Sequence, residues 1–156
     1  MLKIGDVIKW NNCPFRKDLK SKKKPRWWIY LGKRQDGSSL LIMVTATTQT
    51  QYYKVGEDRF KNKRISIKKG DFGFNDDCLI DLDIGISYDE IAEAELSEHQ
   101  ADIEPISNIK ETRETFMREI YNKICESRKT PLRIKKDIHY SFNLAGITGL
   151  KQPKRL

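Results

Sequence analysis

The residues Arg26–Leu31, with the sequence RWWIYL, form the strongest strand signal in the chain. Aromatic and β-branched residues favour strands, and Gly32 ends the run. Because side chains alternate along a strand, Trp27 and Trp28 point to opposite faces, so one of them belongs to the core. The sequence does not decide which tryptophan is exposed.

Further strands are expected on both sides of this run, separated by polar turns. Ile4–Trp10 precedes it, and Leu40–Val44 follows the turn sequence Gln35–Ser38 and continues through a threonine-rich stretch. Shorter strands are expected at Gln51–Lys54, Arg64–Ile67 and Cys78–Ile84. Together these strands predict a small, barrel-like antiparallel sheet.

Towards the C-terminus the hydrophobic pattern changes to the period of a helix. Glu111–Arg128 carries apolar residues on one helical face, and Pro131 ends the segment. Ser87–Glu90 fits a capping box that opens a short helix, although a strand there is also compatible with the sequence. We therefore expect one α+β domain over residues 1–156, with a barrel at about 1–87 and a helical part at about 107–156.

The 156-residue chain has a net charge of +8, and its charges are unevenly distributed. Residues 1–70 hold 18 basic and 5 acidic side chains, residues 71–110 hold 1 and 12, and residues 111–156 hold 11 and 5. This asymmetry indicates a surface that faces a polyanion, although a solvated surface with a local imbalance gives the same counts. Lys20–Arg26 holds five cations in seven residues and is expected to be a mobile loop that orders on a partner.

Cysteine usage and hydropathy favour a soluble cytoplasmic protein. Cys13, Cys78 and Cys125 are widely spaced and form no C-x-x-C pair, as expected for free thiols rather than for disulfides or a zinc site. The longest apolar runs are far shorter than the roughly 20 residues that span a bilayer, and the N-terminus lacks the pattern of a signal peptide. We expect neither a metal nor another cofactor.

No template of a common catalytic apparatus is present, neither a phosphate-binding glycine loop nor a nucleophile elbow. Cations and flat rings are instead mixed at Arg26, Trp27, Trp28, Tyr30, Tyr52 and Tyr53. This combination binds single-stranded nucleic acid by stacking and phosphate neutralisation. Thr45, Thr47 and Thr48 are either plain strand residues or hydroxyls that bond a phosphate or ribose.

Asp81 and Asp83 lie two residues apart on an expected strand and therefore on one face. Two carboxylates in this arrangement could bind a metal or share a proton. The alternation of a half-buried strand more simply places both on its solvent side.

The order of several motifs resembles the PemK/MazF family of toxins. GDVIxW at Gly5–Trp10 is followed by Pro14-Phe15 and by SKxKP at Ser21–Pro25 before the apolar strand. The strand ending in Val44-Thr45 and the stretch FGFxxDCLIxLDIxIS at Phe72–Ser87 are similar to later motifs of the family. The resemblance covers about residues 4–128 and includes a helix that closes the barrel. It leaves Arg133–Tyr140 open as an extra helix, an arm across a dimer or more RNA-binding surface.

The resemblance implies an SH3-like barrel that forms a homodimer and acts as a metal-independent endoribonuclease on single-stranded RNA. Members of the family cleave RNA through attack of the ribose 2′-hydroxyl, and an antitoxin protein neutralises them. We therefore expect the toxin of a type II toxin–antitoxin system. The alternative is a non-catalytic nucleic-acid-binding or regulatory barrel of the same fold, and a module whose basic loop docks an acidic peptide is a third hypothesis.

Site residues are carried over from the family position by position. Its arginine corresponds to Arg26 or Lys24, and Arg26 is favoured because lysine cannot make the two-pronged phosphate contact of a guanidinium. Its strand-end threonine corresponds to Thr45, and Cys78 stands where the family has a serine. The expected catalytic residues are Arg26, Lys24 and Thr45, and the expected RNA-binding residues are Arg16, Lys22, Lys23, Trp27, Thr47, Thr48 and Asp81.

Overall fold

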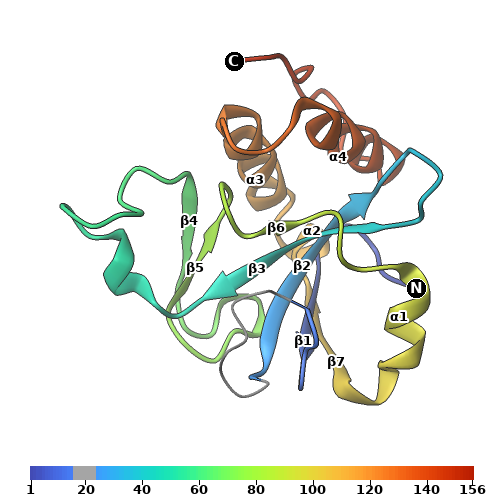
Figure 1. The fold of residues 1–156 in the computed structure, drawn as a ribbon, viewed down its shortest axis with the longest axis horizontal. Coiled ribbons are helices and arrows are strands. Elements are labelled where there is room, and N and C mark those ends of the chain that lie inside the picture. Colours follow the sequence, from blue (N-terminus) through green and yellow to red (C-terminus); the bar gives the residue numbers. More distant parts are fainter. Residues whose placement is uncertain (16–23) are drawn as a thin grey trace.

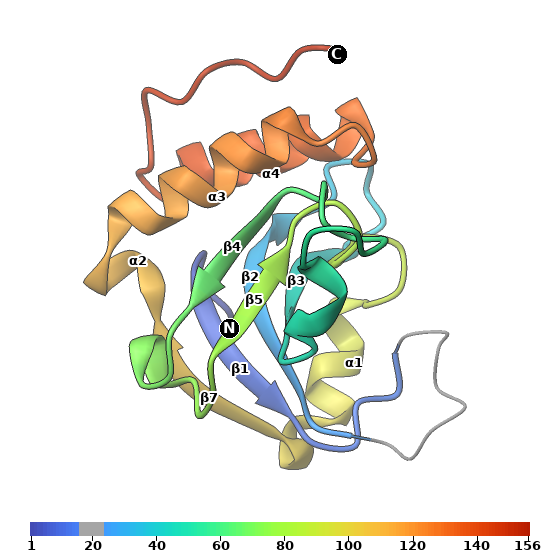
Figure 2. The same cartoon turned by 90° about the vertical axis from the view of Figure 1, so that its left-hand side faces the viewer.

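A computed structural model of the chain describes residues 1–15 and 24–156. Arg16, Lys22, Lys23 and most of the expected loop at Lys20–Arg26 lie outside the described residues. The described part consists of a twisted antiparallel sheet, two longer helices across one end of it and a short helix at its side (Figures 1 and 2).

Among the described residues, seven antiparallel strands make up the sheet, in the order β4-β5-β3-β2-β1-β7, with β6 paired to β3. They are β1 (Asp6–Trp10), β2 (Arg26–Lys33), β3 (Leu41–Thr47), β4 (Arg64–Ile67), β5 (Cys78–Asp81), β6 (Ile86–Ser87) and β7 (Ile103–Asn108). Strand β3 pairs with β2 as far as Thr45 and with β5 from Ala46 onwards. In the part of the chain that the structure describes, the edge strands β4 and β7 do not pair with each other, so the sheet is open.

In residues 1–15 and 24–156, four α-helices and three 3-10 helices complete the α+β fold. They are α1 (Glu93–Glu98), α2 (Ile109–Thr112), α3 (Glu114–Glu126), α4 (Leu132–Leu144), η1 (Thr50–Tyr53), η2 (Asp71–Gly73) and η3 (Gln100–Asp102). Helices α3 and α4 contact each other, and α4 packs on β2. The segment around η1 extends on the side of the sheet away from α1 (Figure 1). None of the helices in the described ranges is both long and apolar enough to cross a membrane.

The core surrounds β2, as its sequence predicts. Trp28, Ile29 and Leu31 are fully buried there. Gly32 lets α4 approach, because it adopts φ +134° and a Cβ atom at this position would lie 2.3 Å from Ser141. On α3 the apolar side faces the core, which explains the helical period of its sequence. The three cysteines are buried and free, as expected.

Several predicted elements are confirmed, and others are wrong. The strands expected around β1 to β5 and the helix expected around α3 are present, and Arg133–Tyr140 lies within α4. Gln51–Lys54 is not a strand, because the chain turns through η1 there. Ser87–Glu90 does not open a helix, since Ser87 lies in β6 and α1 begins only at Glu93. No strand was expected at β7.

Candidate nucleic-acid interface

The predicted site residues are distributed over two faces of the sheet. Trp28 pairs with Thr45 across β2 and β3, so their side chains share one face. Arg26 lies two residues before Trp28 and Thr47 two residues after Thr45, and alternation places both on that same face, called here the arginine face. Trp27, between Arg26 and Trp28, points to the opposite face.

Trp27 is the partly exposed member of the tryptophan pair, which the sequence could not decide. It is half-buried and stacks on Phe74 with 5.1 Å between ring centroids and an interplanar angle of 29°. The Lys9 Nζ atom lies 5.8 Å from the Trp27 ring centroid. Trp27 therefore packs against the margin of the core, with a cation beside its ring.

The two threonines of the arginine face differ in what their hydroxyls bond. Thr45 is 7% exposed, and its hydroxyl donates to the carbonyl oxygen of Trp27 over 3.1 Å. Thr47 is half-buried, and its Oγ1 accepts the backbone N–H of Gln49 over 3.1 Å. Since a hydroxyl both accepts and donates, the proton of Thr47 can be donated to a ligand.

Lys24 and Thr48 are exposed at the same end of the sheet. Lys24 lies two residues before β2 begins, and Thr48 follows the last residue of β3. In an antiparallel pair the start of one strand lies beside the end of the other. The structure therefore brings Lys24, Arg26, Thr47 and Thr48 to one end of the sheet.

Glu90 is a potential functional residue that the sequence analysis missed. Burial raises the pKa of the Cys13 thiol, Arg26 opposes this shift, and Glu90 adds to it, so the guanidinium and the carboxylate both act on one buried thiol. The Glu90 Oε2 atom is buried and has no hydrogen-bond partner among the described residues. Glu90 was not considered as a site residue because the sequence analysis interpreted it as part of a helix-capping box.

Asp81 does not face solvent, so the solvent-side interpretation is wrong for this residue. It is 3% exposed, and its Oδ2 accepts the Tyr53 hydroxyl at 2.7 Å and the Asn62 amide at 2.9 Å. Its Oδ1 accepts the backbone N–H groups of Asp83 and Ile84 at 2.9 and 3.0 Å. Asp81 thus fixes the turn after β5 and anchors the segment after β3, and both of its oxygens are bonded to other groups of the protein.

Asp83 and Cys78 have local roles of their own. The Asp83 Oδ2 accepts the backbone N–H of Lys63 over 3.0 Å. Burial raises the pKa of Cys78 to about 11, with Asp77 and Asp76 adding to the shift, so its thiol stays protonated at neutral pH. Within residues 1–15 and 24–156, no group of three or more His, Cys, Asp or Glu side chains is placed to hold a metal ion.

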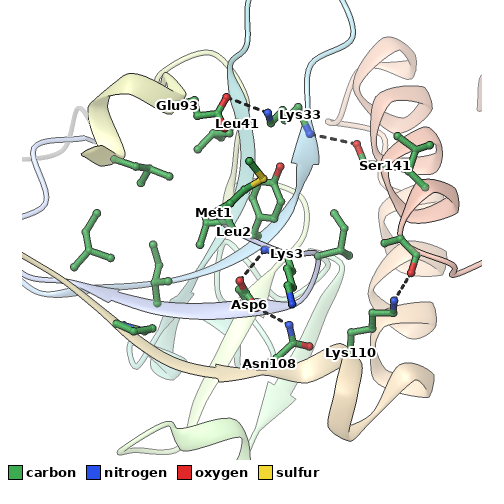
Figure 3. Close-up of a pocket in the computed structure, with 18 of the residues that line it drawn as sticks. Met1, Leu2, Lys3, Asp6, Lys33, Leu41, Glu93, Asn108, Lys110 and Ser141 are labelled. Atoms are coloured by element: carbon green, nitrogen blue, oxygen red, sulfur yellow. Dashed lines mark hydrogen bonds and ion pairs between the residues drawn. The ribbon is translucent and has the colours of Figure 1, made fainter. Parts of the chain in front are cut away.

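A groove of about 1130 Å³ lies elsewhere, between α1, α4 and the strands β1, β2 and β7 (Figure 3). Charged side chains of the groove bond to other groups of the protein: Lys33 Nζ donates to Glu93 at 3.0 Å, and Asp6 accepts the Lys3 backbone N–H at 2.7 Å. Burial raises the pKa of Tyr30 in the groove to about 12, with Glu93 and Asp6 adding to the shift. The described residues that line the groove include none of the predicted site residues.

The chain was compared with known proteins. No protein-family model matches it, and no curated protein matches it significantly.

Proposed function

We propose that the chain is a metal-independent endoribonuclease that cleaves single-stranded RNA and acts as the toxin of a toxin–antitoxin pair. The proposal is carried by one observation: Arg26 and Thr47 share a face at the end of the sheet where Lys24 and Thr48 are exposed. Guanidinium, ammonium and hydroxyl groups are the donors that phosphate oxygens accept. These positions are close to those that the family resemblance assigns to the site.

The chemistry follows from these groups. The ribose 2′-oxygen attacks the neighbouring phosphorus, and the bond from phosphorus to the 5′-oxygen breaks, which leaves a 2′,3′-cyclic phosphate and a 5′-hydroxyl. Arg26 stabilises the extra negative charge of the pentacoordinate phosphate, and Thr47 donates to one of its oxygens. Glu90 takes the proton of the 2′-hydroxyl, and solvent protonates the departing 5′-oxygen.

The finer features of the proposal rest on the resemblance of residues 4–128. The open sheet is a variant of the SH3-like barrel, and the protein acts as a cytoplasmic homodimer. An antitoxin protein neutralises it. The excess of 18 basic over 5 acidic side chains in residues 1–70 supports binding of RNA or of an acidic antitoxin segment to this half of the chain.

A non-catalytic RNA-binding domain is the second candidate function. It is favoured by the internal use of Thr45 and Asp81, because both side chains bond to other groups of the protein. On this hypothesis Arg26, Thr47 and Lys24 bind the RNA backbone, and no bond is broken.

The test is incubation of the purified, folded protein with unstructured RNA in excess EDTA, beside the same sequence with 2′-deoxy sugars. The proposal predicts cleavage of the RNA with cyclic-phosphate ends and no cleavage of the deoxy strand. RNA that is bound but stays intact would favour the second candidate. Cleavage of the deoxy strand, or cleavage that requires an added divalent metal, would contradict the mechanism.

A further inference from the structure

Residues 50–64, between β3 and β4, form a cluster of rings and guanidinium groups outside the site described above. We call it the arginine–aromatic projection; it contains Tyr52, Tyr53, Arg59, Phe60 and Arg64. The Arg59 guanidinium lies 5.4 Å from the ring centroid of Tyr52 and 5.9 Å from that of Tyr53. Arg64 lies 5.6 Å from the Tyr53 ring centroid and 5.8 Å from that of Phe60. These distances are within the range of cation–π contacts.

The base of the projection is held in place by hydrogen bonds, and the bond between Tyr53 and Asp81 is buried. The Tyr53 hydroxyl and the Asn62 amide both donate to Asp81. Arg64 donates to the backbone carbonyl oxygens of Phe60, Asn62 and Tyr53 at 2.6, 3.2 and 3.3 Å. Because these bonds fix the backbone before any ligand arrives, little order has to be gained on binding.

The outer side of the projection exposes apolar rings in a positive environment. Tyr52 is 43% exposed and Phe60 is 40% exposed. Residues 50–64 hold five basic and two acidic side chains. No carboxylate in the described ranges forms an ion pair with Arg59 or Arg64. Flat rings beside cations fit a ligand that offers both bases and phosphates, whereas an acidic peptide would use only the cations.

The base of the projection lies on the arginine face. Thr47 pairs with Leu79, and Arg64 pairs with Asp81, in neighbouring strands. Leu79 and Asp81 are two residues apart, so all four side chains lie on the same face as Arg26. The chain enters η1 only three residues after Thr47. The projection therefore begins close to Thr47 along the chain.

We propose that the arginine–aromatic projection is a second contact surface for single-stranded RNA. Bases stack on Tyr52 and Phe60, and Arg59 contacts a phosphate beside them. This inference deepens the proposed function and rests on it, because it assigns a further part of the substrate to the face that carries Arg26 and Thr47.

The test measures binding of the full chain to a single-stranded 2′-fluoro RNA of about 20 nucleotides, which lacks the attacking hydroxyl and so separates binding from cleavage. Tyr52→Ala and Phe60→Ala are each expected to weaken binding about tenfold. Arg59→Gln is expected to reduce the slope of log affinity against log salt by about one. Tyr140→Ala is the matched control, because Tyr140 is a 50% exposed tyrosine on α4.

The possible outcomes distinguish a failure of the projection hypothesis from a failure of the proposed nuclease function. Unchanged affinity in Tyr52→Ala and Phe60→Ala, with wild-type binding intact, would overturn the projection and leave the nuclease. Weaker binding in both variants of a protein that cleaves no RNA would support the projection and reject the nuclease. A wild-type protein that binds a glutamate-rich peptide but no RNA would overturn both.

Discussion

Thr45 and Thr47 are two residues apart on β3, yet their hydroxyls have different partners. The hydroxyl of Thr45 is buried and bonds to the carbonyl of Trp27, whereas that of Thr47 is half-buried and accepts the backbone N–H of Gln49 in its own turn. We infer that the strand-end threonine of the site is Thr47, although the family pattern points first to Thr45.

Valine at each position separates the two roles. Thr45→Val is expected to lower the free energy of unfolding by about 1 kcal/mol, because the Trp27 carbonyl loses its donor, and to leave RNA cleavage unchanged. Thr47→Val is expected to change stability by less than about 0.5 kcal/mol, because water can replace the hydroxyl as acceptor of the exposed Gln49 N–H. It is expected to slow cleavage about 100-fold, since a donor to the phosphate is lost. Urea unfolding and single-turnover cleavage measure the two effects, and the reverse assignment would show Thr45 to be the ligand-binding threonine.

Tyr53 and Asp81 form the buried bond that anchors the projection. Burial and Asp81 raise the pKa of Tyr53 to about 12. A tyrosine whose pKa is higher in the folded than in the unfolded state stabilises the fold fully below its unfolded pKa of about 10, and this stabilisation is lost as the pH rises towards 12.

Tyr53→Phe is therefore expected to be about 2 kcal/mol less stable than wild type at pH 7, because a hydrogen bond to a carboxylate is lost. The difference should shrink between pH 10 and pH 12, as measured by urea unfolding across that range. Tyr52→Phe is the control and should match wild type throughout, since its ring is exposed. A constant difference from pH 7 to pH 12 would contradict the role given to the Tyr53 hydroxyl.

At the scale of elements, the sequence predicts what depends on a local pattern. β2 and α3 were predictable because each has a local hydrophobic pattern that indicates the element and its burial. β2 has a dense run of apolar residues, and α3 has apolar residues at helical spacing. Gln51–Lys54 was mistaken for a strand because Tyr52 and Tyr53 favour strands, while the bond to Asp81 and the arginine contacts that turn the chain are tertiary. β7 was missed because Glu104 and Pro105 interrupt its alternation.

The candidate site, like the fold, could be predicted only in part from the sequence. Arg26 and Lys24 stand out by charge and position, whereas the burial of Asp81 and the place of Glu90 depend on contacts between distant segments. Neither feature can be predicted from a short stretch of sequence. The burial of Asp81 depends on how β5 packs, and the position of Glu90 depends on how the segment before α1 packs.

The end of α3 depends on a buried lysine from α4. Lys135 is 3% exposed, and its Nζ donates to the backbone carbonyl oxygens of Cys125 and Ser127 at 3.0 and 2.6 Å. These carbonyls lie at the C-terminus of α3, where the helix itself provides no donors. Burial lowers the pKa of Lys135, with Cys125 and Asp83 opposing the shift.

Lys135→Met is expected to lower the free energy of unfolding by about 3 kcal/mol, because two buried carbonyls lose their donor. Lys136→Met is the matched control and should change stability by less than about 0.5 kcal/mol, since Lys136 is exposed. Urea or thermal unfolding checks both variants. Equal stabilities of the two would mean that Lys135 does not hold the α3–α4 junction.

At the scale of the whole molecule, the candidate nucleic-acid interface and the groove lie in different places. Lys24, Arg26, Thr47 and Thr48 lie at the end of the sheet where β2 begins, whereas the groove lies between α1 and α4 (Figures 1 and 3). The groove is therefore not where the donors for a phosphate gather. A polyanion lying along an open surface needs no deep pocket, because its affinity comes from phosphate contacts and stacking.

The most direct test of the account is the single-turnover rate of RNA cleavage in excess EDTA by wild type, Arg26→Ala and Lys24→Ala, with folding of each variant checked by circular dichroism. If Arg26 stabilises the transition state, Arg26→Ala slows cleavage about 1000-fold while its affinity for uncleavable 2′-fluoro RNA falls less than tenfold, and Lys24→Ala slows cleavage less than tenfold. Wild-type rates in Arg26→Ala, or a larger loss in Lys24→Ala, would contradict the account.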